Sequence, residues 1–302
     1  MLFFFSQGNI LTIIILLRSN LRQYTTMRYL TAVAIADLCS LYSWNLNLFY
    51  KHLINPYQND IEDLSIFTCR LISYMAFVSL ELSSWYLTLV SLDRCLNIHF
   101  LFWNRQFGQA KYSVYIILTI TILILGLNFH LLLFNGYREV NCQPLGKRTC
   151  VVCYATETDQ YYIFPKWEKV HVIIYNFIPF SIMLLSNSFI IYRSIITSKT
   201  KQSSASQRRQ RQLTLILILV TFLFVFLTTP VMIYNVFLRN YLKDRKPLKY
   251  FVLGILQCIQ FTSHAVRKRI FSSRITSILV FFCFSRLISL STVMVHRNFV
   301  KN

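Results

Sequence analysis

A long apolar segment at residues 67–92 limits what this chain can fold into more than any other feature of its sequence. Only two residues within it are charged. At about 1.5 Å per residue, a helix over this segment is longer than the ~30 Å hydrocarbon core of a bilayer. Cys69 lies near one end, and an acid-base pair, Asp93-Arg94, follows the other. The segment therefore predicts a tilted membrane helix whose two ends face different compartments.

The composition of the 302-residue chain agrees with a membrane protein. Hydrophobic residues make up 55% and charged residues only 14%, whereas about a quarter of the residues in soluble domains are charged. A formal net charge of +20 is typical of nucleic-acid binding, but here the basic residues lie between apolar runs rather than along one face. We therefore expect the lipid bilayer as a partner, and no nucleic acid.

Seven apolar runs predict an all-α bundle of seven transmembrane helices. Besides the central run they cover residues 2–17, 29–50, 112–134, 170–196, 213–238 and 250–266. The segments after runs one, three and five are basic, and short basic loops remain in the cytoplasm. The segment after run six is basic too, but three loops outweigh one. This orientation predicts an N-terminus outside the cell.

Two acids lie inside apolar runs, Asp37 in the second and Glu81 in the third. An acid at membrane depth costs about 2.5–3.5 kcal/mol on insertion scales, so it normally faces the bundle interior with a partner. Asp37 is therefore a functional candidate, and the alternative is an acid near a helix end that reaches water. For Glu81 the two interpretations are a contact for a cationic ligand group and an internal hydrogen bond to another helix.

Cys69 is predicted to lie on the same outer face as three cysteines of the long polar segment 135–169. These are Cys142, Cys150 and Cys153. Disulfides persist on the oxidising face, and closing a loop of about 80 residues constrains the unfolded chain by roughly 4–5 kcal/mol. The sequence alone leaves the choice between Cys150 and Cys153 open.

These features together resemble the rhodopsin-like G-protein-coupled receptors. The residues that carry the resemblance, which covers residues 1–266, are Gly8-Asn9, Leu30, Asp37-Leu38, Cys69, Asp93-Arg94-Cys95, Pro179 and Pro230. The resemblance implies a multi-pass plasma-membrane receptor with an extracellular ligand and a heterotrimeric G protein as partners. The sequence has neither metal-ligand spacing among its histidines nor a Gly-rich phosphate loop, so we expect no enzyme activity and no cofactor.

The resemblance also assigns roles to single residues. Asp93 and Arg94 match the triplet that holds such receptors inactive and then meets the G protein, with Cys95 in place of the usual tyrosine. Asp37 and Ser83 match a pocket for water and sodium. The full set expected to form the internal switch is Asn9, Asp37, Ser83, Phe224 and Pro230.

For the disulfide we expect Cys69 to pair with Cys153, which lies nearest the fifth run. Cys142 and Cys150 are then free to pair with each other.

The ligand class follows from further comparison with the family. Amine receptors have an aspartate seven residues after the third-helix cysteine, where this chain has Ala76, and the seventh run has no lysine for retinal. The long outer segment looks like the hairpin lid of peptide receptors. We therefore expect a neuropeptide, with Ala76 and Glu81 as candidates for the ligand pocket.

Two other functions stay open, and the C-terminal part departs from the family. Buried acids and prolines also mark the ion paths of transporters and channels, and a receptor-like bundle can lose signalling. Residues 267–302 form an atypical basic and hydrophobic segment that begins with Arg267-Lys268-Arg269 where the family has an Asn-Pro motif. The receptor domain is therefore predicted to end at Val266, followed by an eighth span, a membrane-surface helix or the product of an altered reading frame.

Overall fold

The computed structural model describes a little under two thirds of the chain in two compact units, residues 1–200 and residues 201–302. The described residues are 2–18, 22–50, 61–100, 103, 110–142, 147–153, 166–200, 205–234, 252, 255, 256 and 259. Most of the predicted seventh run, the predicted boundary at Val266 and all of residues 267–302 lie outside these ranges, so the expectations about them stay predictions.

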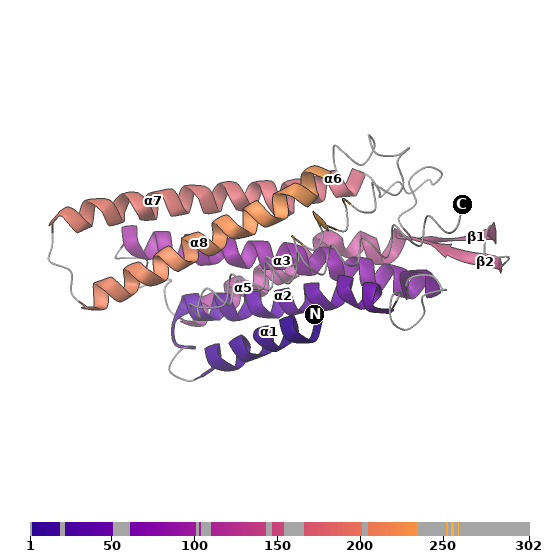
Figure 1. The fold of residues 1–302 in the computed structure, drawn as a ribbon, viewed down its shortest axis with the longest axis horizontal. Helices are drawn as coiled ribbons and strands as arrows, with labels where there is room; N and C mark the ends of the chain where they lie inside the picture. The colour runs from indigo at the N-terminus through magenta and orange to yellow at the C-terminus, as the bar shows by residue number, and fades with distance from the viewer. Residues whose placement is uncertain are drawn as a thin grey trace. The chain divides into compact units, whose positions relative to one another are not determined.

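The first unit contains helices that coincide with the first five predicted runs, and a hairpin (Figure 1). They are α1 (Leu2–Leu16), α2 (Thr25–Phe49), η2 (Ile61–Leu64), α3 (Ile66–His99), α5 (Ala110–Phe134), β1 (Tyr137–Cys142), β2 (Lys147–Val152), α6 (Lys166–Val172), η3 (Ile173–Phe177) and α7 (Ile178–Thr200). The last three form one continuous helical stretch, in which η3 is π-helical. In the second unit, α8 (Ala205–Ile233) begins eight residues before the predicted sixth run.

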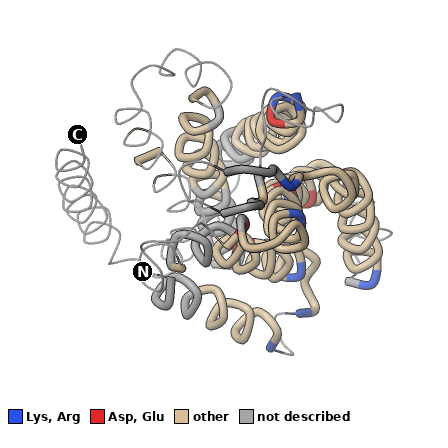
Figure 2. The backbone as a smooth tube through the Cα atoms, turned by 90° about the vertical axis from the view of Figure 1, so that its right-hand side faces the viewer, with Lys and Arg blue, Asp and Glu red and all other residues tan. Residues whose placement is uncertain are grey.

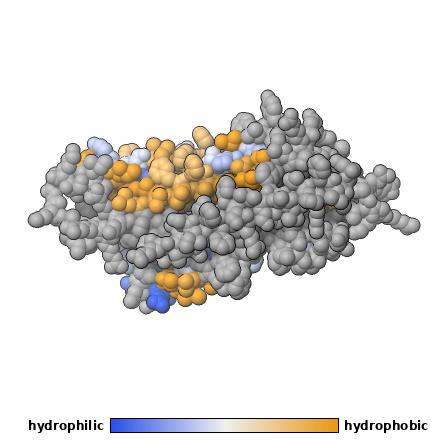
Figure 3. Space-filling model, in the orientation of Figure 1, coloured by the Kyte–Doolittle hydropathy of each residue, from blue (hydrophilic) through white to orange (hydrophobic). Residues whose placement is uncertain are grey.

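The surface of these helices suits hydrocarbon rather than water. Within the described part of the chain, three stretches are long and apolar enough to cross a membrane: Ile66–His99, Lys111–Phe134 and Lys166–Arg193. Large apolar side chains of α5, such as Ile122, are exposed, and the described surface in Figure 3 is mostly hydrophobic. Lys and Arg lie near helix ends (Figure 2). An exposed apolar helix is stable only where lipid covers it.

The start of α3 is fixed by its own sequence. Ser65 is the N-cap residue, and its hydroxyl accepts from the Thr68 amide at 3.0 Å while the Thr68 hydroxyl accepts from the Ser65 amide. This reciprocal capping box satisfies two backbone groups that a helix start leaves without partners. The helix can therefore begin at the edge of the apolar segment.

Hydrogen bonds from α3 define the direction of its neighbours. As residue numbers rise along α3, those of its partners on α2 and α5 fall, so both helices run antiparallel to α3. These pairs are Asp93 with Thr26 (2.8 Å), Ser83 with Asp37 (2.5 Å), Arg70 with Asn135 (2.9 Å) and Tyr86 with Thr121 (2.6 Å). Partners on η3 and α7 come in the same order: Ser84 with Tyr175 (2.7 Å) and His99 with Phe189 (3.4 Å). This alternation is what a chain crossing a bilayer back and forth requires.

A two-stranded antiparallel hairpin follows α5. Gly136 has a positive φ of 75° at the turn into β1, a conformation that glycine adopts without steric cost. Cys153 directly follows β2 and forms a disulfide with Cys69 at the start of α3, with Cα atoms 6.0 Å apart. The hairpin is thereby tied to α3.

The register of this hairpin contradicts the expected bond between Cys142 and Cys150. Cys142 pairs with Lys147, and Cys150 pairs with Glu139. Glu139 and Cys142 are three residues apart on one strand, which corresponds to about 10 Å. A disulfide needs Cα atoms within about 7 Å, so this expectation is wrong for the observed register.

Removing the Cys69 disulfide is expected to destabilise the folded chain. Because it closes a loop with a sequence separation of 84, Cys69→Ser or Cys153→Ser should cost up to about 4–5 kcal/mol, and the double variant no more than either single variant. Thermal unfolding of the purified full chain measures this. Cys39→Ser is the matched control because that thiol is free, and equal melting temperatures for all variants would contradict the expectation.

Candidate functional site

The buried polar side chains of α3 form the centre of the candidate site. Water cannot satisfy them at membrane depth, so their partners must come from neighbouring helices or from the helix's own backbone. They are Ser73, Ser79, Glu81, Ser83, Ser84, Thr88, Ser91 and Asp93.

Asp37 and Ser83, which the sequence predicts together, are in direct contact. The Ser83 hydroxyl donates to Asp37 Oδ1 at 2.5 Å, and the two residues are 1% and 0% exposed. The acid thus faces the bundle interior, not water. Asn9, the third expected member, is fully buried in α1, but its amide makes no hydrogen bond within the described part of the chain.

Asp93 is held by α2 at the far end of α3. Its carboxylate accepts from Thr26 at 2.8 Å and from Thr25 at 3.1 Å, both in the first turn of α2. Its neighbour Arg94 is half-buried, and Arg94 Nε has no hydrogen-bond partner among the residues that the structure describes. Sequence reasoning missed the two threonines, although adjacent hydroxyls at the start of an apolar run were an available signal.

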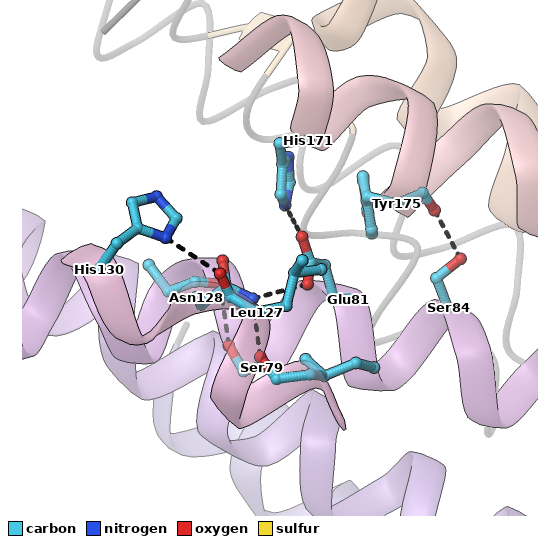
Figure 4. A network of polar contacts seen from close by, with 10 residues as sticks. Ser79, Glu81, Ser84, Leu127, Asn128, His130, His171 and Tyr175 are labelled. Atoms are coloured by element: carbon cyan, nitrogen blue, oxygen red, sulfur yellow. Dashed lines mark hydrogen bonds and ion pairs between the residues drawn. The ribbon is translucent and has the colours of Figure 1, made fainter. Parts of the chain in front are cut away.

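Glu81 lies where three helices meet. Its Oε2 accepts from Asn128 Nδ2 of α5 at 2.7 Å, and its Oε1 lies 3.6 Å from His171 Nε2 of α6 (Figure 4). Glu81 is 0% exposed and Ala76, the other pocket candidate, 1%. Of the two interpretations of Glu81, the internal hydrogen bond therefore describes this structure.

His171 is surrounded by aromatic rings. It stacks on Tyr175, with ring centroids 5.1 Å apart, and meets the edge of Phe77 at 4.6 Å. Sequence reasoning missed both His171 and Asn128 as partners of Glu81. A histidine and an asparagine inside apolar runs were the signal, but periodicity does not tell which helices face each other.

Ser84 contacts the fifth span beside Pro179. Pro179 has no backbone N–H, so the carbonyl four residues earlier, that of Tyr175, cannot accept a hydrogen bond from it. The Ser84 hydroxyl donates to this carbonyl at 2.7 Å (Figure 4). A neighbouring helix therefore supplies a donor to the carbonyl that Pro179 cannot serve, which helps a membrane helix to tolerate proline.

The expected switch residues of the sixth run lie in α8, in the second unit. Phe224 is 1% exposed, and Pro230 lies inside the helix. Thr228, which stands where the family has a tryptophan, donates to the Phe224 carbonyl at 2.7 Å. Its hydroxyl is thus used within its own helix.

Comparison with known proteins identifies the class. A model of the 7 transmembrane receptor (rhodopsin family) matches residues 8–286. No curated protein matches the sequence significantly. The chain belongs to the rhodopsin family of G-protein-coupled receptors and is a multi-pass membrane protein with a seven-helix bundle. The match continues twenty residues past Val266, and it favours a receptor over a transporter or channel.

Ser84→Ala is expected to destabilise the bundle by about 1 kcal/mol. The change removes the hydrogen bond from the Ser84 hydroxyl to the Tyr175 carbonyl, and hydrogen bonds between membrane helices contribute about this much. Denaturant unfolding in detergent measures the difference. Ser188→Ala is the control, since the Ser188 hydroxyl is exposed and bonds only to the Leu184 carbonyl of its own helix. Equal losses for both variants would show that Ser84 has no special role.

Proposed function

We propose that this chain is a plasma-membrane receptor that binds an extracellular neuropeptide and transmits the binding to a heterotrimeric G protein. The observation that carries the proposal is the family match over residues 8–286. The described geometry supports it, because α3 is hydrogen-bonded to α2, α5 and α7, and the Asp93-Arg94 pair stands near its end. The N-terminus and the hairpin are on the outer face in this proposal.

Coupling to the G protein runs through Asp93 and Arg94. In the structure the two hydroxyls of Thr25 and Thr26 hold the Asp93 carboxylate against α2. When ligand binding separates these helix ends, the carboxylate loses its threonine donors, and the rearranged end of α3 presents Arg94 to the G protein.

The ligand class rests on the outer part of the first unit. The hairpin β1–β2 is bonded to α3 through Cys69 and Cys153, so it stays next to the start of α3. Ala76 offers no carboxylate for an amine. A peptide can bind by backbone hydrogen bonds to strands and by aromatic contacts, which suits this hairpin better than a small amine.

Inside the bundle, Asp37 and Ser83 relay the change together with Asn9, Phe224 and Pro230. The Asp37 carboxylate and the Ser83 hydroxyl, which are in contact, both offer oxygen atoms. Hard cations prefer oxygen ligands. The two side chains would hold a sodium ion in this proposal, and the ion would supply a positive charge that stabilises the buried acid.

Arg94→Ala is expected to abolish G-protein activation and to leave membrane insertion intact. A cation near the membrane interface contributes little to insertion, so surface expression should match that of the unchanged receptor. Nucleotide exchange on a co-expressed G protein measures coupling, and surface labelling measures insertion. Full activation by the variant would refute the role of Arg94.

Thr26→Val is expected to raise ligand-independent signalling. The variant keeps the size of the side chain but removes the shorter of the two threonine hydrogen bonds to Asp93. Thr31→Val is the matched control, because the Thr31 hydroxyl donates to the Met27 carbonyl of its own helix. Basal signalling per surface receptor is the measurement, and an equal effect of both changes would speak against Asp93 as the restraint.

A peptide-library screen with a G-protein readout tests the ligand class directly. A peptide hit confirms the neuropeptide proposal. Uptake or current without G-protein activation would instead indicate a transporter or channel, and folded surface protein silent to all ligands would indicate a bundle that no longer signals.

A further inference from the structure

Three buried polar side chains from three helices meet with their hydrogen bonds incomplete. They are Glu81 of α3, Asn128 of α5 and His171 of α6, all at most 4% exposed (Figure 4). The Asn128 amide donates to Glu81 Oε2 at 2.7 Å. Glu81 Oε1 and His171 Nε2 have no hydrogen bond within the described residues, although they face each other. Because unsatisfied polar atoms are costly where water is excluded, this arrangement needs a further component.

The distance between the two facing atoms limits what that component is. Glu81 Oε1 and His171 Nε2 are 3.6 Å apart. A bridging water needs a hydrogen bond of about 2.8 Å to each atom, hence a wider gap than this unless the three atoms are sharply bent. A small rotation of either side chain closes the gap to a direct hydrogen bond. Only a proton fits between the two atoms.

Counting protons shows which state satisfies the pair. The His171 ring hydrogen-bonds to the Phe77 backbone, which leaves Nε2 to face Glu81. Without a proton both facing atoms are acceptors, and with two protons both are donors. With one proton, one group donates and the other accepts, and the pair as a whole carries no net charge. One proton is therefore the state that a water-free interior stabilises.

We propose that Glu81 and His171 form an internal binding site for a single proton, oriented by Asn128, and that the bound proton joins α6 to α3 and α5. The site goes beyond the proposed receptor function and does not depend on it. Its ligand is a proton, and its effect is to make the position of the outer half of the fifth span depend on protonation.

The other titratable groups of these helices have contacts of their own. On α3, Tyr74 donates to the Leu125 carbonyl and Tyr86 bonds to Thr121. On α5, His130 bonds to the Leu127 carbonyl and meets the edge of Trp167. Tyr175, which stacks on His171, and Lys166, Glu168 and Lys169 lie on the same helical stretch as His171. On α2, Asp37 accepts from Ser83. The other titratable groups of α3 and α5 lie several turns from Glu81 and Asn128, toward the helix ends: Arg70, Asp93, Arg94, Cys95, His99, Lys111, Tyr112 and Tyr115. Within the described residues, none of these forms an ion pair with Glu81 or His171.

The proton site predicts the direction of a pH effect on stability. In the unfolded chain, glutamate and histidine lose their protons near pH ~4.3 and ~6.5. Above about pH 7 the folded chain therefore holds one proton more than the unfolded chain, and stability falls as pH rises. The melting temperature of the purified full chain in detergent should show this fall.

Glu81→Gln is the decisive variant because its amide carries a permanent donor for His171 Nε2 and an oxygen for Asn128. We expect a melting temperature close to that of the unchanged chain near pH 7 and a weaker fall above it. Glu81→Leu should melt several degrees lower, since it leaves His171 and Asn128 without their partner. His130→Phe, which alters a histidine outside the site, should retain the full pH effect.

Two outcomes would overturn the proposal: a Glu81→Gln variant with an undiminished pH effect, or one that melts as low as Glu81→Leu. If Glu81→Gln does not fold, nitrogen NMR of the histidine-labelled wild-type chain decides, with His171→Phe assigning the signal. The His171 ring should keep a hydrogen-bonded Nε2 above about pH 7. A ring that titrates near pH ~6.5, as an exposed histidine does, would refute the site.

Discussion

The absence of water inside a bilayer is the constraint on which this structure depends. Every buried polar group must find its partner within the protein, and α3 carries many of them. Its hydroxyls and carboxylates are therefore divided among neighbours: Asp37 of α2 bonds to Ser83, Asn128 of α5 to Glu81, and the Tyr175 carbonyl of η3 to Ser84. These hydrogen bonds also fix the direction of each neighbouring helix. A few polar side chains therefore determine how the apolar helices are arranged.

Much of the fold was predictable, because the cost of exposing a backbone to lipid acts on length and composition alone. The helix α5, Ala110–Phe134, lies within two residues of the predicted run. Asp37 was predicted to face inward with Ser83 on the cost of a buried charge and on family resemblance, and the two are in contact. Where one strong energetic term decides, the sequence is sufficient.

The rest could not be predicted, because it depends on which faces meet. Glu81 was recognised as a buried acid, but its partners Asn128 and His171 were not. Both lie in almost wholly apolar runs, and the hydropathy of such a run does not show which side of the helix faces α3. The two threonines that hold Asp93 were missed for the same reason. The register of the hairpin separates Cys142 from Cys150, and cysteine spacing alone does not contain that register.

The π-helical turn η3 has a consequence for the rotational phase of the fifth span. A residue added to an α-helix turns everything beyond it by about 100°. His171 lies before this turn and Pro179 after it. Deleting one residue of the turn would restore α-helical spacing and rotate the two halves against each other. Either His171 could then face Glu81, or the helix beyond Pro179 could keep its present contacts with α3. The shorter turn would not allow both. The number of residues in this turn is therefore as important for the structure as the identity of any side chain in it.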